Sequence, residues 1–285
     1  ALIPLIEKFP EKIMFCSDDK HPDDLIRNGH INQLVKRAIS AGYDILDVLR
    51  AASYNPVKHY RLNVGLLQSG DDADFVIINN FSDLNILKMY IKGELIAENG
   101  NSLLSFQPQR NLINQFKASK LQVEDIHVKP RGERLKVIVV SDGQLFTHAG
   151  TFEPKVENGN VVSDTENDIL KLVVYNRYEN SKPSVGFIKN IGLKKGALAS
   201  TVSHDSHNIV AVGTSDEEIV SAINKIIDSK GGILVCNENE SYLLPLPVGG
   251  LMSPDDGFSV AKNYELVDAK AKEFGSGLNA PFMTV

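Results

Sequence analysis

The sequence predicts a chain of mixed class, with an α/β pattern near its N-terminus and an α+β pattern over its C-terminal half. Near the start, the apolar run 13–16 has the character of a short buried strand, and carboxylates follow it before a helix begins. From residue 126 onward, β-rich runs alternate with helical patterns. Because the chain has 285 residues and 42% of them are hydrophobic, it can bury cores in two domains.

Helical spacing and boundary residues predict the elements that follow the first strand. Apolar residues recur at helical intervals over 29–41, and Gly42 marks the end of that helix. Asp44 is a suitable N-cap for a helix over 45–52. We expect that helix to end before the Asn55-Pro56 turn, because a residue that precedes proline disfavours helical backbone.

Residues 55–105 alternate short β-rich runs with turns. Strands are predicted at 75–78 and 87–92, and Lys92-Gly93-Glu94 has the composition of a hairpin tip. Residues 106–125 contain proline, asparagine and mixed charges, and we interpret them as a linker.

The C-terminal region combines strands with two long helices. Residues 215–218 have the spacing of a capping box, and isoleucines form one apolar stripe up to the Gly231-Gly232 pair. A second helix is expected over 258–274. The strand candidates are 135–140, 169–175, 184–189, 209–212, 232–236 and 241–246.

Composition excludes several classes of protein. The net charge of −6 and the absence of a strongly basic run argue against nucleic-acid binding. Cys16 and Cys236 lie far apart, so the sequence predicts neither a disulfide framework nor a zinc ribbon, and we expect a reducing, cytoplasmic setting. No apolar run approaches the roughly 20 residues that cross a bilayer, so no membrane association is expected.

The segment 17–24, Ser-Asp-Asp-Lys-His-Pro-Asp-Asp, is the first candidate for chemistry. Polar residues at the carboxyl end of a strand face the active-site mouth in α/β enzymes, although the local pattern taken alone favours aspartates that cap the next helix. Further motifs follow in order, and together they resemble adenine deaminases of the amidohydrolase superfamily over essentially the whole chain. These motifs are Gly29-His30-Ile31, the Asn55-Pro56 turn, the Gly-rich and Ala-Asp-hydrophobic stretch 70–78, and the segments 202–208 and 244–253.

The resemblance implies a domain organisation. Residues 1–54 would be the last β/α unit of a TIM-type barrel, 55–105 a small β-sandwich-type domain, 106–125 a linker and 126–285 an adenine-deaminase-like α+β domain. The family's metal centre begins with a His-x-His pair, which this sequence lacks. We therefore expect the chain to be an incomplete portion of the enzyme, with most metal ligands upstream of residue 1.

The resemblance also implies a reaction and a cofactor. Adenine would be hydrolysed to hypoxanthine and ammonia, a step of purine salvage, at a two-metal site with Mn²⁺ expected and Fe²⁺ or Zn²⁺ as alternatives. Asp18 matches the family's aspartate at the tip of the eighth strand, which binds metal and carries the proton. Asp19 is the rival for this role, because neighbouring strand residues point in opposite directions. Alternatively, Asp19 hydrogen-bonds the substrate or a metal-bound histidine.

His204, Asp205 and His207 form a second candidate cluster between two β-rich runs. Taken locally they are a polar turn, and two histidines three residues apart are weak evidence for metal. The resemblance implies a loop that closes over the barrel mouth and touches the purine base, in an enzyme that is a homo-oligomer. The Gly pair in 246–253 fits a ligand-proximal loop and an ordinary connection equally well.

Two other functions fit the same sequence. The barrel features are shared by amidohydrolases that act on cyclic amides or other amines. Alternatively, residues 126–285 form a non-catalytic module for assembly or regulation.

Overall fold

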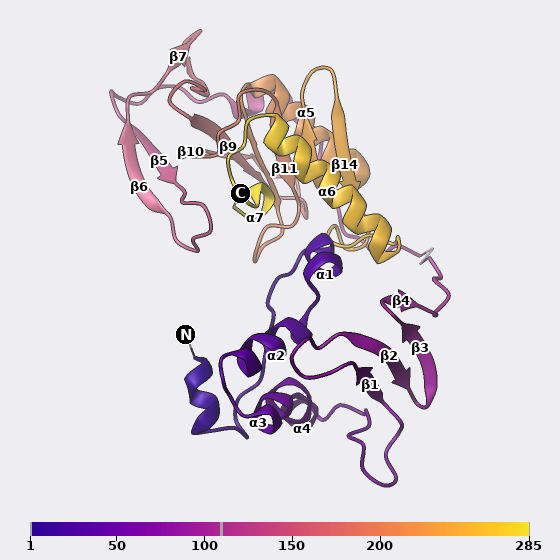
Figure 1. The fold of residues 1–285 in the computed structure, drawn as a ribbon. Helices are drawn as coiled ribbons and strands as arrows, with labels where there is room; N and C mark the ends of the chain where they lie inside the picture. The colour runs from indigo at the N-terminus through magenta and orange to yellow at the C-terminus, as the bar shows by residue number, and fades with distance from the viewer. Residues whose placement is uncertain (1, 109–110, 285) are drawn as a thin grey trace. The chain divides into compact units, whose positions relative to one another are not determined.

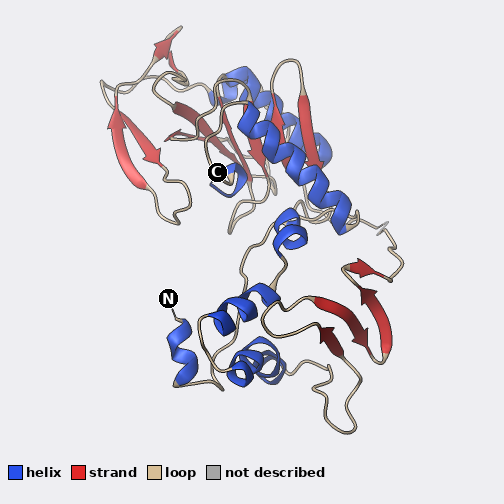
Figure 2. Ribbon diagram, viewed as in Figure 1, coloured by secondary structure: helices blue, strands red, loops and turns tan. Residues whose placement is uncertain are grey.

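The structure is a computed structural model that describes residues 2–108 and 111–284 (Figure 1). The chain divides into two compact units, residues 1–107 and 108–285. The division falls within the predicted linker, 106–125, of which residues 109 and 110 lie outside the described residues. Helices and several sheets occur together, so the predicted mixed class is confirmed (Figure 2).

The first unit begins with a group of short helices around a small apolar core. Val35 and Ala38 of one helix meet Val48 and Ala51 of the next pair, and all four are buried together with Ile6. The helices are the 3₁₀-helix η1 (Ile3–Glu7), α1 (Pro22–Asn28), α2 (Ile31–Ser40), α3 (Ile45–Leu49), the π-helix η2 (Arg50–Tyr54) and α4 (Asn55–Tyr60). The helix predicted over 29–41 is therefore confirmed as α2.

The predicted strand at 13–16 is wrong for the described residues. This segment is extended, and the Phe15 amide donates to the Ala51 carbonyl at 3.1 Å, but no strand of residues 2–108 pairs with it. An isolated extended segment lacks the ladder of hydrogen bonds that defines a strand, and a parallel strand needs a neighbour from a separate part of the chain.

The predicted end of the second helix before Asn55-Pro56 is also wrong. Helical backbone continues from α3 through η2 into α4, where Pro56 occupies the first turn. A proline at that position is tolerated because its missing N–H would have no helical partner there. The Asn55 amide donates to the carbonyls of Pro10 (2.6 Å) and Ile13 (2.7 Å), which ties the helix to the extended segment. Asp44 caps α3 as predicted.

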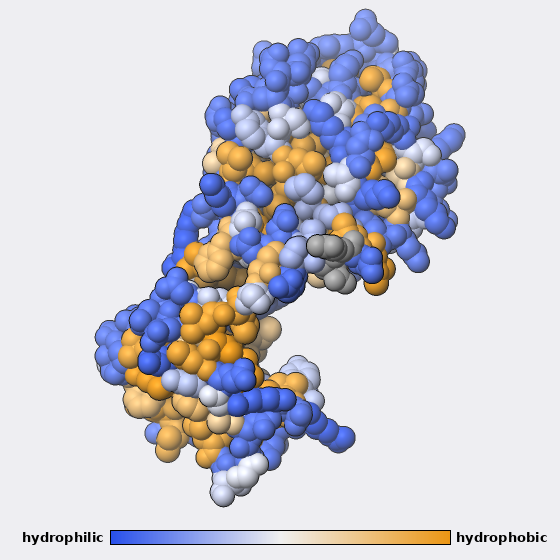
Figure 3. All heavy atoms as spheres, turned by 90° about the vertical axis from the view of Figure 1, so that its right-hand side faces the viewer, coloured by the Kyte–Doolittle hydropathy of each residue, from blue (hydrophilic) through white to orange (hydrophobic). Residues whose placement is uncertain are grey.

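A four-stranded antiparallel sheet completes the described part of the first unit. Its strands are β1 (Phe75–Ile78), β2 (Ile86–Ile91), β3 (Glu94–Glu98) and β4 (Asn101–Ser102), in that order. Lys92 and Gly93 have positive φ at the predicted hairpin tip, and Asp74 accepts the Lys92 amide at 2.7 Å. One face carries half-exposed apolar side chains, among them Val76 and its cross-strand partner Met89, and Figure 3 shows apolar surface on this unit.

In the described part of the second unit, an eight-stranded sheet has the order β14-β13-β11-β12-β9-β10-β5-β6. Neighbouring strands are antiparallel except β10 and β5. Each predicted strand is present. The strands are β5 (Leu135–Val139), β6 (His148–Phe152), β9 (Ile169–Tyr175), β10 (Ser184–Lys189), β11 (Ala197–Ser200), β12 (Ile209–Gly213), β13 (Gly232–Cys236) and β14 (Ser241–Pro245), with a separate hairpin of β7 (Val156–Glu157) and β8 (Asn160–Val161).

The helices α5 (Asp216–Ser229) and α6 (Gly257–Glu273) confirm the two predicted helices and cover opposite faces of this sheet. Leu170 of β9 packs in the core that contains Val267 of α6, whereas Val173 of the same strand packs in the core that contains Ile223 of α5. Alternate residues of one strand point to opposite faces, so both faces of the central strands are buried. Short helices η3 (Val123–Ile126) and α7 (Pro281–Thr284) complete the unit.

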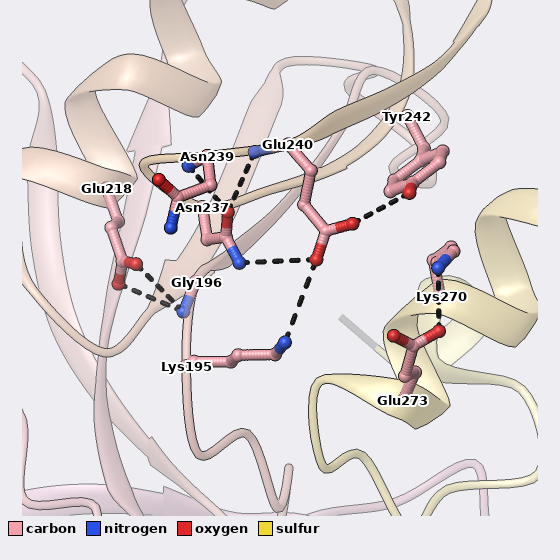
Figure 4. Close-up of polar contacts among 9 residues, drawn as sticks. All are labelled: Lys195, Gly196, Glu218, Asn237, Asn239, Glu240, Tyr242, Lys270 and Glu273. Atoms are coloured by element: carbon pink, nitrogen blue, oxygen red, sulfur yellow. Dashed lines mark hydrogen bonds and ion pairs between the residues drawn. The ribbon is translucent and has the colours of Figure 1, made fainter.

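Polar side chains connect the sheet to the helices. The carboxylate of Glu218 in α5 accepts the Gly196 amide, so only the Ser215 side of the predicted capping box is formed by these contacts (Figure 4). Glu240 accepts a hydrogen bond from the Tyr242 hydroxyl at 2.7 Å, which lowers the pKa of Glu240. Among the helices of residues 2–108 and 111–284, none combines the length and apolar composition needed to cross a membrane.

Candidate functional site

Asp18 lies at the end of the extended segment, in the loop before α1. It is exposed and has a left-handed backbone with φ of 55°, a conformation that aspartate tolerates better than most residues. Its Oδ1 accepts the Asp19 amide at 3.0 Å, and its own amide donates to the sulfur of Cys16 at 3.4 Å. Asp19 is also exposed. The two carboxylates therefore stand at the tip of the segment, as the sequence predicts.

Side chains on both sides hold this loop against α1 and α2. The Ser17 hydroxyl and the His30 ring are hydrogen-bonded at 2.5 Å, and Lys20 donates to the Gly29 carbonyl at 3.1 Å. Lys20 also forms an ion pair with Asp24 at 2.7 Å. The amide of Asn28 and the Lys20 ammonium lower the pKa of Asp24. The Asp24 carboxylate thus bonds to side chains in and beside helix α1. Asp18 and Asp19 are the carboxylates at the end of the extended segment.

The second candidate cluster is a loop of the second unit, residues 203–208, which precedes β12. The rings of His204 and His207 meet edge to face with centroids 5.1 Å apart. The His207 amide donates to the Ser203 carbonyl at 2.6 Å. The Nδ1 atom of His207 and the Oδ1 atom of Asn208 are buried and have no hydrogen-bond partner among the described residues. Unpaired buried polar atoms are costly, so these two atoms are candidate partners for a bound water or ligand.

Arg177 joins this loop to a second one. Its side chain is 2% exposed, and its Nε donates to the His207 carbonyl at 2.6 Å while Nη2 donates to the Gly249 carbonyl at 2.8 Å. Nη2 also donates to the Tyr178 hydroxyl at 2.8 Å, and that hydroxyl donates to the Ser206 carbonyl at 3.2 Å. One guanidinium therefore connects loop 203–208 with loop 247–252.

The same contact with Arg177 explains the glycine at position 250 of loop 247–252. Gly249 and Gly250 have φ of 62° and 75°. A Cβ atom on Gly250 would lie 2.4 Å from Nη1 of Arg177, whereas one on Gly249 would meet nothing within 4 Å. The close approach that glycine permits at position 250 is here an approach to the Arg177 side chain, and the Thr201 hydroxyl donates to the Gly250 carbonyl at 2.5 Å.

The sequence did not single out Arg177 as a functional residue. It lies two residues after the end of β9, and the antiparallel pairing of Tyr175 with Ile209 places it opposite His207. The predicted site residues fall into two groups: Asp18 and Asp19 in the first unit, and His204, Asp205 and His207 in the second.

The residues that the structure describes do not form a complete metal centre. Among residues 2–108 and 111–284, no group of three or more histidine, cysteine, aspartate or glutamate side chains is arranged to hold a metal ion. Asp18 offers one carboxylate, and a divalent cation in a protein needs several such ligands.

Comparisons with known proteins match both units. Residues 1–96 match the family model described as "Amidohydrolase family", and residues 144–285 match the one described as "Adenine deaminase C-terminal domain". Proteins named adenine deaminase are similar over the whole chain, with 46% identity in Methanosarcina mazei, 47% in Methanosarcina acetivorans and 45% in Parabacteroides distasonis. The chain covers 53%, 53% and 52% of these proteins, so it spans about half the length of the curated relatives it matches.

Proposed function

Because this chain belongs to the adenine deaminase family of amidohydrolases, we propose that it forms part of an enzyme that hydrolyses adenine to hypoxanthine and ammonia. The observation that carries this proposal is the order of the two family matches along one chain, each on a different structural unit. Relatives named adenine deaminase align with all of the chain, which supports the same substrate.

We propose that residues 1–54 form the last β/α unit of a TIM-type barrel. Segment 13–16 is extended and apolar, and helices follow it, as in such a unit. A cavity of about 1170 Å³ lies beside this segment, lined by Met14 and Phe15 and by residues of α2 that include Leu34. An apolar hollow beside an extended segment is where further strands of a barrel would pack.

Asp18 is the carboxylate that we propose for proton transfer. During hydrolysis, water forms a bond to the ring carbon that carries the amino group, and the carbon–nitrogen bond then breaks. One proton of the water passes to Asp18 and from there to the departing nitrogen, which leaves as ammonia, and the other ends on the ring nitrogen beside the new carbonyl group of hypoxanthine. The exposed carboxylate at the tip of the segment is accessible for this role. Asp19 would then hydrogen-bond the substrate.

We propose that the complete enzyme uses a divalent metal, with manganese expected and iron or zinc as alternatives. The ligands of such a metal would include residues beyond those that the structure describes, because the described residues do not form a metal centre. The chemistry proposed for this chain is limited to proton transfer by Asp18 and to binding of the substrate.

Loop 203–208 is the proposed purine-binding element. The buried, unpaired Nδ1 of His207 and Oδ1 of Asn208 suit a ligand that carries both an amine and ring nitrogens. His204 packs against His207, and Asp205 is exposed in the same loop. These residues would form hydrogen bonds with the amino group and the ring nitrogens at the edges of the base.

The proposal is tested by ammonia release from the full-length protein that carries these residues, purified with added manganese. Adenine is compared with a panel of cyclic amides. Preferential release of ammonia from adenine is expected. Turnover of a cyclic amide in place of adenine would assign the chain to another amidohydrolase reaction. If removal of residues 126–285 leaves both turnover and adenine affinity unchanged, loop 203–208 has no role in binding.

A further inference from the structure

We propose that Arg177 is a positioning residue that holds loops 203–208 and 247–252 together and thereby sets the affinity of the enzyme for adenine. This inference rests on the proposed function, because it assumes that loop 203–208 binds the base. Neither the sequence pattern nor the family matches single out Arg177.

The burial of Arg177 is unusual for a cation. Arg177 is 2% exposed, and its hydrogen bonds go to two backbone carbonyls and the Tyr178 hydroxyl rather than to a carboxylate. Arginine is seldom fully buried unless it is paired, because removing its charge from water is costly. Here backbone carbonyls and aromatic rings take the place of the carboxylate. The guanidinium lies 4.4 Å from the ring centroid of Tyr178 and 5.7 Å from that of Phe116.

The directions of the N–H donors of the guanidinium match the positions of one carbonyl in each of the two loops. Nε and Nη2 point to the carbonyls of His207 and Gly249, residues that are far apart in the sequence. A lysine ammonium is a single point donor, so it cannot reproduce both directions from the same position. Gly250 leaves the space that the guanidinium fills, since a Cβ there would lie 2.4 Å from Nη1. Both loops are therefore shaped around arginine at this position.

The contacts of Arg177 help to fix the position of His207 in the candidate site. Its carbonyl is bonded to Arg177 and its amide to the Ser203 carbonyl, so the backbone is fixed on both sides of the ring. The Nδ1 atom of the ring stays buried without a partner in the described residues, as does Oδ1 of the neighbouring Asn208. A site whose binding atoms are held in place before the ligand arrives loses less entropy on binding. Loss of the arginine fork therefore weakens binding of the base more than it slows the chemical step.

The test compares Arg177→Lys and Arg177→Met in the full-length protein, with Arg134→Lys as a control at an exposed position. Both Arg177 variants are expected to raise KM for adenine at least tenfold, the effect of losing one hydrogen bond from a charged group, while kcat changes by less than about threefold. Lysine should not rescue the effect, because it lacks the fork. The Arg134 variant should match the wild type.

A merely structural role gives a different result. Arg177→Lys would then reduce the fraction of folded enzyme, so apparent kcat would fall while KM stayed the same, and this outcome would overturn the proposal. Unchanged KM and kcat would overturn it as well.

Hydrogen exchange separates this inference from the proposed function. If the wild-type protein does not deaminate adenine, the proposed function fails, but the two loops can still be followed. Arg177→Lys should then speed amide exchange in peptides covering 203–208 and 247–252 together. Unchanged exchange in both peptides would show that Arg177 does not hold these loops.

Discussion

Replacing Lys171 with methionine should strongly destabilise the second unit. Lys171 lies in the middle of β9 with its side chain fully buried. Its ammonium donates to Oδ2 of Asp216 at 2.7 Å and to the Ile126 carbonyl at 3.2 Å, and it lies 2.6 Å from Oδ1 of Asp216. Methionine preserves the stem of the side chain but removes the ammonium that pairs with the buried Asp216 carboxylate, whose remaining basic neighbour is His127, with Nε2 3.9 Å from Oδ2 of Asp216.

The size of the effect follows from the loss of that ammonium. Removing one partner of a buried ion pair costs about 3–5 kcal/mol. Asp216 side-chain exposure is 9%, so water can do little to compensate, and the first turn of α5 offers it only a partial positive charge. We expect a loss of about 3–5 kcal/mol for Lys171→Met. The double variant with Asp216→Asn should recover part of this loss, because no buried charge is then left.

Urea-dependent hydrogen exchange at β9 and α5 measures this effect within the second unit, where unfolding of the first unit does not interfere. Lys136→Met, at an exposed position of β5, is the matched control and should stay within about 0.5 kcal/mol of the wild type. If Lys171→Met costs less than about 1 kcal/mol, or if the double variant is as unstable as the single one, the ion pair does not stabilise the unit in the way described.

Two further predictions concern loops and caps. Gly250→Ala should cost about 3 kcal/mol, from the positive φ of 75° and the displacement of Arg177, whereas Gly249→Ala, with open space at its Cβ, should cost about 1–2 kcal/mol in thermal unfolding. Equal losses of stability in the two variants would contradict the claim that close contact with Arg177 requires glycine at position 250. Asp256 caps α6, and the Ser259 hydroxyl lowers its pKa below 3.8, so the cap should stabilise the unit above pH 3.8 and lose this contribution as the pH falls through the lowered pKa. The stability advantage of the wild type over Asp256→Asn should therefore decrease as the pH falls from about 5 to about 2. A constant difference would contradict the role of the Asp256 carboxylate as the cap.

Sequence patterns predicted the elements that carry their own signal. Strands such as β9 and β13 are dense in β-branched and large apolar residues between turn signals, and α5 has its own cap and apolar stripe. The strand β11 was missed because its residues, Ala-Leu-Ala-Ser, have weak strand preference. Its place at the centre of the sheet is fixed by its neighbours β12 and β13 rather than by its own sequence.

Predictions that depended on contacts between residues far apart in the sequence were less accurate. The extended segment at 13–16 was predicted as a strand from its composition, yet a strand also requires a neighbour. Helical backbone passes through Asn55-Pro56 because contacts of the Asn55 side chain support it, and local preference could not reveal these. Arg177 was missed for the same reason: its two carbonyl partners, 30 and 72 residues away in sequence, come close only when the sheet forms.

The structure shows where the candidate site residues lie but does not test their roles. Asp18 and Asp19 are adjacent at the end of the extended segment, and the rings of His204 and His207 are in contact. The roles of these residues remain predictions, because they depend on a substrate and on ligands that these residues do not supply alone.

The most direct test of the account compares Asp18→Asn with Asp19→Asn in the full-length, metal-loaded protein, with ammonia release from adenine as the readout. If Asp18 transfers the proton, its variant should lose at least about 100-fold in kcat with little change in KM, in line with the usual size of general acid–base catalysis. Asp19→Asn should retain kcat within about tenfold and change mainly KM. An Asp18→Asn enzyme with nearly normal kcat, or a larger loss of kcat in Asp19→Asn, would contradict the assignment of Asp18.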